Sequence, residues 1–227
     1  MILAVHFIEA RSEIKALTLD EENKLIEVSK DDKLYSLFVV ALDSGLRLGE
    51  LLALTWSDID LDREEINVNK NVIYVKNYEG KSKTKNIIVV QNNPKTKSSI
   101  RKVPLTQRSL NLLKELKSKT NSIMVFATKT GNYLNSRNVE RSFVRNATKA
   151  GIVDCNFHSL RHTFATRLFE RGVSVNVVSK LLGHAKVSIT TDIYISVIPS
   201  LKSDAIKVLD LLHSEQMENK PIINQLR

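Results

Sequence analysis

Two histidines and an arginine in this chain are spaced to share one face of a helix. His158, Arg161 and His162 stand at i, i+3 and i+4 of the run His-Ser-Leu-Arg-His, and residues so spaced are neighbours on a helix surface. A phosphodiester under attack gathers negative charge on its non-bridging oxygens, and a guanidinium offers paired donors of matching geometry. The cluster therefore favours a phosphate ligand, although His162 taken alone is most simply a buried or supporting histidine.

The same histidines allow a second interpretation, a zinc site. Cys155, His158, His162 and His184 are all ligand types that zinc accepts. An arginine inside the cluster would repel a cation, however, and no carboxylate separates the histidines as in the zinc-protease helix motif. We therefore expect no metal site.

A second arginine stands at the start of an otherwise apolar helix. Arg47 follows a glycine turn in Ser44-Gly-Leu-Arg-Leu-Gly-Glu50, where an arginine adds little to packing. Glu50, one turn later, could orient it. An ordinary i, i+3 surface ion pair is the alternative interpretation of this motif.

A histidine and a tyrosine follow further along the chain. His184 comes directly after Gly183, a predicted helix stop, and Tyr194 lies ten residues later in Thr-Thr-Asp-Ile-Tyr. A lone tyrosine is usually a half-buried aromatic residue, and the chain has four others. None of these residues identifies a site by itself.

Taken together, in order and spacing, these motifs resemble the tyrosine recombinase (phage integrase) family. The resemblance extends from about Leu17 to Tyr194, and its character is closest to integrases of conjugative transposons and temperate phages. The run from Pro94 to Pro104 also resembles the family's β-hairpin, in which a lysine before threonine is catalytic; here that lysine is Lys95.

The resemblance implies an enzyme, a site-specific DNA recombinase. Tyr194 would attack a DNA phosphodiester, form a 3′-phosphotyrosyl bond and release a 5′-hydroxyl, and a 5′-hydroxyl of a second duplex would then attack that bond. Because the covalent bond retains the phosphodiester energy, no cofactor, ATP or metal is needed, in keeping with a sequence that has no P-loop or carboxylate cluster.

The resemblance also assigns roles to the other residues. Arg47 and Arg161 would clamp the non-bridging oxygens, and His184 would add a hydrogen bond to them. His158 would assist removal of the tyrosine proton, and Lys95 would protonate the leaving oxygen. Lys97, two residues on, would share a strand face with Lys95 and is the alternative for that role.

The chain's charge is concentrated in one segment. There are 34 Lys and Arg against 25 Asp and Glu, a net charge of +9, and residues 67–108 hold ten of the basic residues but only one acid, Glu79. Such a segment suggests a polyanion, here double-stranded DNA, although a solvated lysine face is the alternative. We interpret four of its members as phosphate contacts or solvated charge: Lys83, Lys85, Lys97 and Arg101.

Hydrophobic periodicity predicts an α+β fold, mostly α, with a small antiparallel sheet. The resemblance implies that this is the catalytic-domain fold of the family, with its basic β-hairpin. A capping box at Thr18 opens the first helix, and apolar runs predict two more, at about 34–43 and from Arg47. Residues 56–62 are expected to form a turn-rich link. Four β-branched runs follow, at 66–68, 72–75, 87–90 and 100–103. Further helices are expected at 107–117, 136–150, 158–171, 175–182, around Tyr194 and from Ser200.

We divide the chain into three parts: an N-terminal remnant or linker at 1–16, the catalytic domain at 17–198, and a C-terminal helix with a polar tail at 199–227. Family members usually carry further DNA-binding domains before the catalytic one, so we expect a catalytic-domain fragment or a short variant. The resemblance also implies a homotetramer of the full-length protein on DNA, with DNA-bending accessory proteins. In that assembly the last helix would be exchanged between protomers; packing of its apolar stripe within the chain is the alternative.

The remaining features are typical of a soluble cytoplasmic protein, here nucleoid-associated. Hydrophobic residues make up 42% and charged residues 26%, Cys155 is the single cysteine, and no apolar run is long enough to span a bilayer. Two alternatives to a recombinase stay open. A type IB topoisomerase would use the same chemistry to relax DNA, and a non-catalytic regulator would bind DNA without forming an adduct.

Overall fold

The computed structural model describes residues 14–76, 86–91 and 100–195, together with five helical positions between 206 and 213. Its helices are α1 (Leu19–Ser29), α2 (Tyr35–Ser44), α3 (Leu48–Ala53), α4 (Gln107–Ser118), α5 (Ser136–Lys149), α6 (His158–Glu170) and α7 (Val175–Leu182), and residues 188–195 are also helical. The strands are β1 (Ile59–Asp60), β2 (Glu65–Val68), β3 (Asn71–Lys76), β4 (Asn86–Gln91) and β5 (Arg101–Pro104). The predicted α+β, mostly helical class is confirmed.

Local sequence signals set the first two helix boundaries. Thr18 accepts a hydrogen bond from the Glu21 amide while the Glu21 carboxylate accepts one from the Thr18 amide, which is the predicted capping box. The second helix ends at Gly45, whose φ of 62° lies in the left-handed region that glycine adopts readily. Arg47, the N-cap residue of α3, follows two residues after this glycine.

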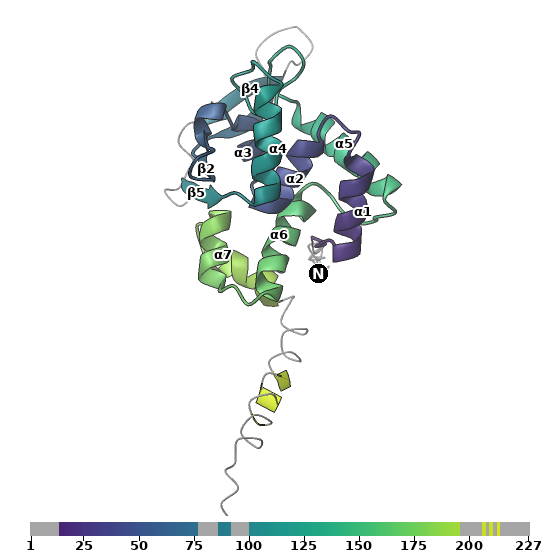
Figure 1. Ribbon diagram of the computed structural model, residues 1–227, viewed down its shortest axis with the longest axis vertical. Helices are drawn as coiled ribbons and strands as arrows, with labels where there is room; N and C mark the ends of the chain where they lie inside the picture. The colour runs from purple at the N-terminus through teal and green to yellow at the C-terminus, as the bar shows by residue number, and fades with distance from the viewer. Residues whose placement is uncertain are drawn as a thin grey trace, which may run out of the picture.

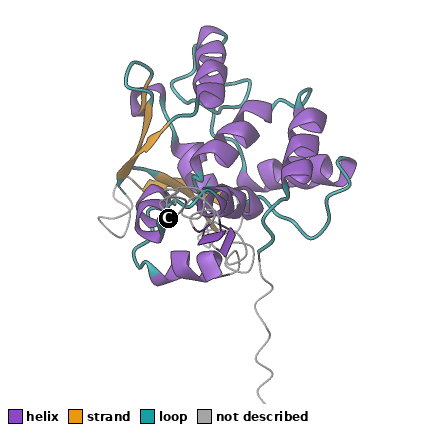
Figure 2. Ribbon diagram, turned by 60° about the horizontal axis from the view of Figure 1, so that its bottom comes forward, coloured by secondary structure: helices purple, strands orange, loops and turns teal. Residues whose placement is uncertain are grey.

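The strands form two antiparallel sheets rather than one. The first has the order β1-β2-β5 and pairs Ile66 with Val103; the second pairs β3 with β4, with Asn71 opposite Gln91. The strands lie along one side of the helical body (Figures 1 and 2). Asn69 and Lys70 connect the two sheets, and both side chains contact the buried Asp58 carboxylate, at 3.2 and 2.6 Å.

The segment expected to be a turn-rich link, Trp56–Asp62, also contains regular structure. A 3₁₀ turn, η1 (Trp56–Asp58), leads into β1, whose two residues pair with the start of β2. A strand of two residues is too short to leave a recognisable periodicity in the sequence.

Two hydrophobic clusters hold the helices. The larger surrounds α2, where Phe38 meets Phe143 and Phe157 with ring centroids 6.0 and 6.3 Å away. The smaller joins α6, α7 and helical residues 188–195 through a separate set of buried side chains: Ala165, Phe169, Val178, Leu182 and Ile193. In Figure 1, α7 lies below β2 and β5, and α6 runs downward beside it. The smaller cluster therefore positions the segment that contains His184 and Tyr194.

Candidate active site

Arg161 joins two turns that are far apart in the sequence. Its side chain is buried at 2% exposure, and its two terminal nitrogens donate to Gly45 O at 2.7 Å and Leu182 O at 2.8 Å. The first carbonyl belongs to the turn before Arg47 and the second to the turn before His184. Burial and the nearby charge of Arg47 lower the pKa of Arg161 to about 9, so the guanidinium remains charged at neutral pH.

Arg47 is held by Glu50, as the motif suggested. The Arg47 Nη1 and backbone amide donate to the two carboxylate oxygens of Glu50 at 3.0 and 2.8 Å. The Arg47 side chain is 39% exposed and that of Glu50 only 6% exposed. The alternative of an ordinary surface pair is wrong for Glu50, since this carboxylate is a buried support for a guanidinium that reaches solvent.

Arg101 differs from its expected role, and the solvated-charge interpretation is wrong. Its side chain is 6% exposed, forms an ion pair with Glu50, and donates through Nε to Leu181 O at 2.6 Å. Burial opposes ionisation of Glu50, but the hydrogen bonds and charges of Arg101 and Arg47 outweigh it and keep the Glu50 pKa below its usual value. A sequence signal was present: strand alternation places Arg101 on the same inward face as Val103.

His158 and His162 lie on one face of α6, as predicted. Their ring centroids are 5.5 Å apart, and His158 and Arg161 line a hollow of about 150 Å³ beside Leu46 and Leu48. Partial burial and the charge of Arg161 lower the pKa of His158 to about 4, although its side chain remains accessible to solvent. His158 is therefore neutral at physiological pH and able to accept a proton. Burial and Arg161 also lower the pKa of His162.

His184 follows the left-handed Gly183 that ends α7 and is positioned by a hydroxyl group. Its Nδ1 lies 2.7 Å from Oγ1 of the fully buried Thr190. Burial and the charges of Arg161, Arg47 and Arg101 lower the pKa of His184 to about 3, so the ring is neutral. When Thr190 donates to Nδ1, the proton of the neutral ring is on Nε2, which is then available to donate to an anion.

Tyr194 lies on the helix that carries Thr190 but in different surroundings. Its half-buried ring packs edge-on against Phe169, with centroids 5.2 Å apart, at the border of the smaller hydrophobic cluster. Within the described ranges, no hydrogen bond or ion pair links Tyr194 to the arginines or histidines. The structure thus brings Arg47, His158, Arg161 and His184 together, and connects Tyr194 to them through its helix.

The basic segment is only partly covered by the structure. Four of its predicted functional residues lie outside the described residues: Lys83, Lys85, Lys95 and Lys97. Of its other members, Lys70 pairs with Asp58 at 2.6 Å, Lys102 pairs with Glu65 and Arg108 pairs with Asp43. Part of the surplus charge is therefore neutralised by acids outside the segment, which a count along the sequence does not show.

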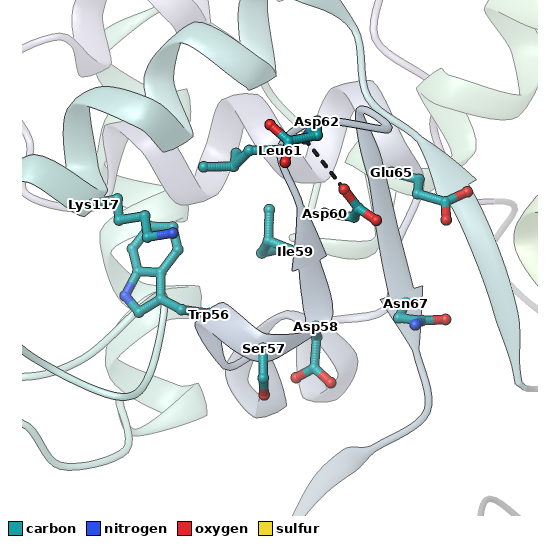
Figure 3. A pocket seen from close by; sticks show the side chains of 10 residues that line it. All are labelled: Trp56, Ser57, Asp58, Ile59, Asp60, Leu61, Asp62, Glu65, Asn67 and Lys117. Carbon is teal, nitrogen blue, oxygen red and sulfur yellow. Dashed lines mark hydrogen bonds between the residues drawn. The ribbon is translucent and has the colours of Figure 1, made fainter.

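Two hollows of similar size differ in charge. One of about 430 Å³ is lined by Arg101, Lys180 and His184 and suits an anion. The other, of about 390 Å³, has Asp58, Asp60, Asp62 and Glu65 among its lining residues, with Trp56 and Lys117 at one side (Figure 3). Carboxylates would repel a phosphodiester, so only the first hollow belongs to the candidate site.

Two kinds of feature are absent from the residues that the structure describes. No three His, Cys, Asp or Glu side chains there are grouped to hold a metal ion. No helix there is long and apolar enough to cross a bilayer. The chemistry that this arrangement can perform is binding of a phosphate group by two guanidinium groups, with two neutral imidazoles beside it.

Comparison with known proteins agrees with this arrangement. The model of the phage integrase family matches residues 15–200. The chain is 37% identical over 216 residues to a tyrosine recombinase XerC-like protein of Caldanaerobacter subterraneus subsp. tengcongensis, covering 88% of this chain and 54% of that protein. It is 27% identical to the ICEBs1 integrase of Bacillus subtilis, covering 88% of this chain and 55% of the integrase. This chain therefore spans about half the length of both relatives.

The fold agrees as well. The Tn1549 transposon integrase, solved in complex with circular intermediate DNA, superimposes with a TM-score of 0.68 at 23% identity, covering 79% of this chain and 62% of that one.

Proposed function

Because the chain belongs to the phage integrase family, we propose that it is the catalytic part of a tyrosine site-specific recombinase, which cleaves and rejoins double-stranded DNA through a 3′-phosphotyrosyl intermediate. The observation that supports this most directly is the convergence of Arg47 and Arg161, with Arg161 bound to the carbonyls on either side of the site. The names of the relatives, a XerC-like recombinase and two integrases, agree with it.

The proposed reaction begins when the Tyr194 hydroxyl oxygen attacks the scissile phosphorus. The tyrosine proton passes to His158, which is neutral before the attack and therefore has a ring nitrogen free to accept it. The bond between phosphorus and the 5′-oxygen breaks, and Lys95 supplies the proton that this oxygen takes up. The second step reverses the first, with the 5′-hydroxyl of another duplex as the nucleophile.

Charge stabilisation falls to the arginines and His184. Arg47 reaches solvent from the N-terminus of α3, so its guanidinium is accessible to DNA. Arg161 and a neutral His184 with its proton on Nε2 complete a set of donors for the non-bridging oxygens. Because buried contacts already orient these donors, little reorganisation is required as charge develops in the transition state.

The domain division and the assembly belong to the same proposal. Residues 17–198 would form the catalytic domain, preceded by a linker at 1–16 and followed by a helix that exchanges between protomers of a tetramer on DNA. Two side chains of that last helix, Ile206 and Leu209, are 59% and 50% exposed, which suits an apolar face that docks on a neighbour. Such an enzyme would act at the nucleoid in the cytoplasm, together with DNA-bending proteins.

A covalent-capture experiment tests the nucleophile. The protein is incubated with a pool of nicked duplexes of randomised sequence, from which the released 5′-hydroxyl fragment diffuses away, and adducts are separated on a denaturing gel. We expect an adduct with the wild type and with the matched control Tyr133→Phe, and none with Tyr194→Phe. An undiminished adduct in Tyr194→Phe would exclude this nucleophile. DNA binding by the wild type with no adduct would favour a regulatory protein.

A further inference from the structure

Arg101 connects three elements of the candidate site. It begins β5, which lies beside α7 (Figure 1), and its side chain extends inward to α3. Its two terminal nitrogens donate to the two oxygens of Glu50 at 3.0 and 2.9 Å, while Nε donates to Leu181 O at 2.6 Å. A forked pair of this kind fixes the orientation of both groups, which a single hydrogen bond does not.

The guanidinium of Arg101 also lies directly against the residue before His184. A Cβ atom added to Gly183 would lie 2.8 Å from Arg101 Nη1 and 3.0 Å from its Cδ, closer than such atoms approach. Glycine is needed at this position for a second reason, because its φ is +66°. The Arg101 side chain therefore forms the surface on which the turn leading to His184 rests.

Two arginines hold consecutive carbonyls at the end of α7. Arg101 binds Leu181 O and Arg161 binds Leu182 O. The last carbonyls of a helix have no partners within the helix and carry partial negative charge, so cations stabilise them. The position of His184, two residues further on, thus depends on both arginines.

Glu50 extends the same network to Arg47. Its carboxylate is shared, with Oε1 accepting from both Arg47 Nη1 and Arg101 Nη1 at 3.0 Å. A shift of Arg101 would consequently move Glu50, and with it the guanidinium of Arg47. One buried side chain therefore connects the supports of two groups that we place at the scissile phosphate.

We propose that Arg101 is a positioning residue of the recombinase site, which acts through Glu50 on Arg47 and through the end of α7 on His184. This inference rests on the proposed function. It differs from a DNA-contact role, because the charge of the Arg101 guanidinium is already paired with the buried Glu50 carboxylate. The two carbonyls that Arg161 binds are neutral, so they do not compensate its charge in the same way.

The test measures the single-turnover cleavage rate of the wild type, Arg101→Lys and Arg101→Met at saturating protein. The substrates are the nicked duplexes on which the wild type forms an adduct. The matched control is Lys102→Met, the next residue on β5, whose side chain is 54% exposed. We expect the cleavage rate to fall about tenfold to a hundredfold in Arg101→Met and less in Arg101→Lys, because small misplacements of reacting groups are costly. DNA affinity and its salt dependence should stay as in the wild type.

A phosphate contact would give the opposite pattern. Affinity would weaken, the salt slope would drop by about 1, and the rate at saturation would not change, which overturns the proposal. A purely structural role would lower the melting temperature and leave the rate of the folded variants at the wild-type value, which overturns it too.

Folding is not expected to prevent the test, because Glu50 keeps Arg47 as a partner in either variant. If neither folds, Gly183→Ala crowds the guanidinium without removing its charge, and a wild-type rate in that variant would overturn the proposal. A wild type that forms no adduct would refute the proposed function itself, and with it this inference. If the wild type forms the adduct and both Arg101 variants cleave at the wild-type rate, the inference is refuted while the proposed function stands.

Discussion

His184 Nδ1 lies 2.7 Å from the hydroxyl oxygen of Thr190, and this contact links the turn after α7 to the helix that carries Tyr194. Thr190 is fully buried, so its hydroxyl has no competing bulk water. The contact fixes the distance between His184 and the start of the helix that carries Tyr194. When Thr190 is the donor in this contact, it also places the proton of His184 on Nε2.

Replacing Thr190 with valine keeps the shape of the side chain and removes its hydroxyl. Without that donor, the proton of His184 is free to move to Nδ1, and Nε2 then has none to donate to the phosphate. We expect the single-turnover cleavage rate to fall about tenfold, the rate equivalent of roughly one hydrogen bond. Thr190→Ser retains the hydroxyl and should cleave at nearly the wild-type rate. Equal rates for the valine and serine variants would exclude this role.

Arg47→Ala should separate catalysis from folding. The Arg47 side chain is 39% exposed and its removal leaves Glu50 paired with Arg101, so the melting temperature should hardly change. Loss of a donor to the developing charge should slow cleavage by about a hundredfold to a thousandfold. Gel-shift binding and thermal unfolding are measured on the same preparation, and a large drop in melting temperature would assign Arg47 to structure.

Arg161→Ala should reduce both the stability of the fold and the rate of cleavage. Its guanidinium is buried and holds Gly45 O and Leu182 O, so its loss leaves two buried carbonyls without their charged donor. We expect about 3 kcal/mol less unfolding free energy, measured by urea denaturation, together with loss of cleavage. Unchanged stability would mean that solvent replaces both contacts.

Local signals in the sequence were sufficient for the framework of the site. The capping box at Thr18 and the glycine stops at Gly45 and Gly183 depend on residues within one helical turn, and the structure has all three. The spacing of His158, Arg161 and His162 on one helix is equally local. These features place Arg47 and His184 directly after their turns.

Contacts between distant residues could not be predicted in the same way. The charge of Arg101 predicts a phosphate contact or a solvated side chain, whereas its contacts are with Glu50, 51 positions away, and with a helix end 80 positions away. The division into two sheets has a similar origin, because β2 pairs with β5 instead of the adjacent β3. Strand alternation marks which residues point inward, but it does not say which strand or side chain they meet.

Asp32→Ala should weaken the fold without changing the chemistry. Burial alone would raise the Asp32 pKa, but hydrogen bonds from Ser142, the Leu34 amide, Asn146 and Arg145 lower it to about 2. Removing the carboxylate takes a partner from the buried Ser142 and Asn146, at an expected cost of about 1–3 kcal/mol in unfolding free energy. Cleavage well below the melting temperature should match the wild type. A slower rate there would connect this cluster to the site.

Acid should destabilise the folded protein before its carboxylates titrate. The pKa values of His158 and His184 are about 4 and about 3 in the fold, below the usual value near 6.5 that they regain on unfolding. As the pH falls below about 6.5, the unfolded chain binds protons that the folded one does not, so the unfolding free energy decreases. Because His158 is solvent-accessible, we expect His184 to contribute the larger share.

Urea denaturation at pH 7 and pH 5 measures this effect. Both values lie above the range in which a carboxylate such as Glu50, with its lowered pKa, takes up protons. The loss of stability between them should shrink in His184→Gln and stay unchanged in His213→Gln, which replaces an exposed histidine on the last helix. Equal stability of the wild type at pH 7 and pH 5 would show that burial and the arginine charges do not lower the His184 pKa in the fold.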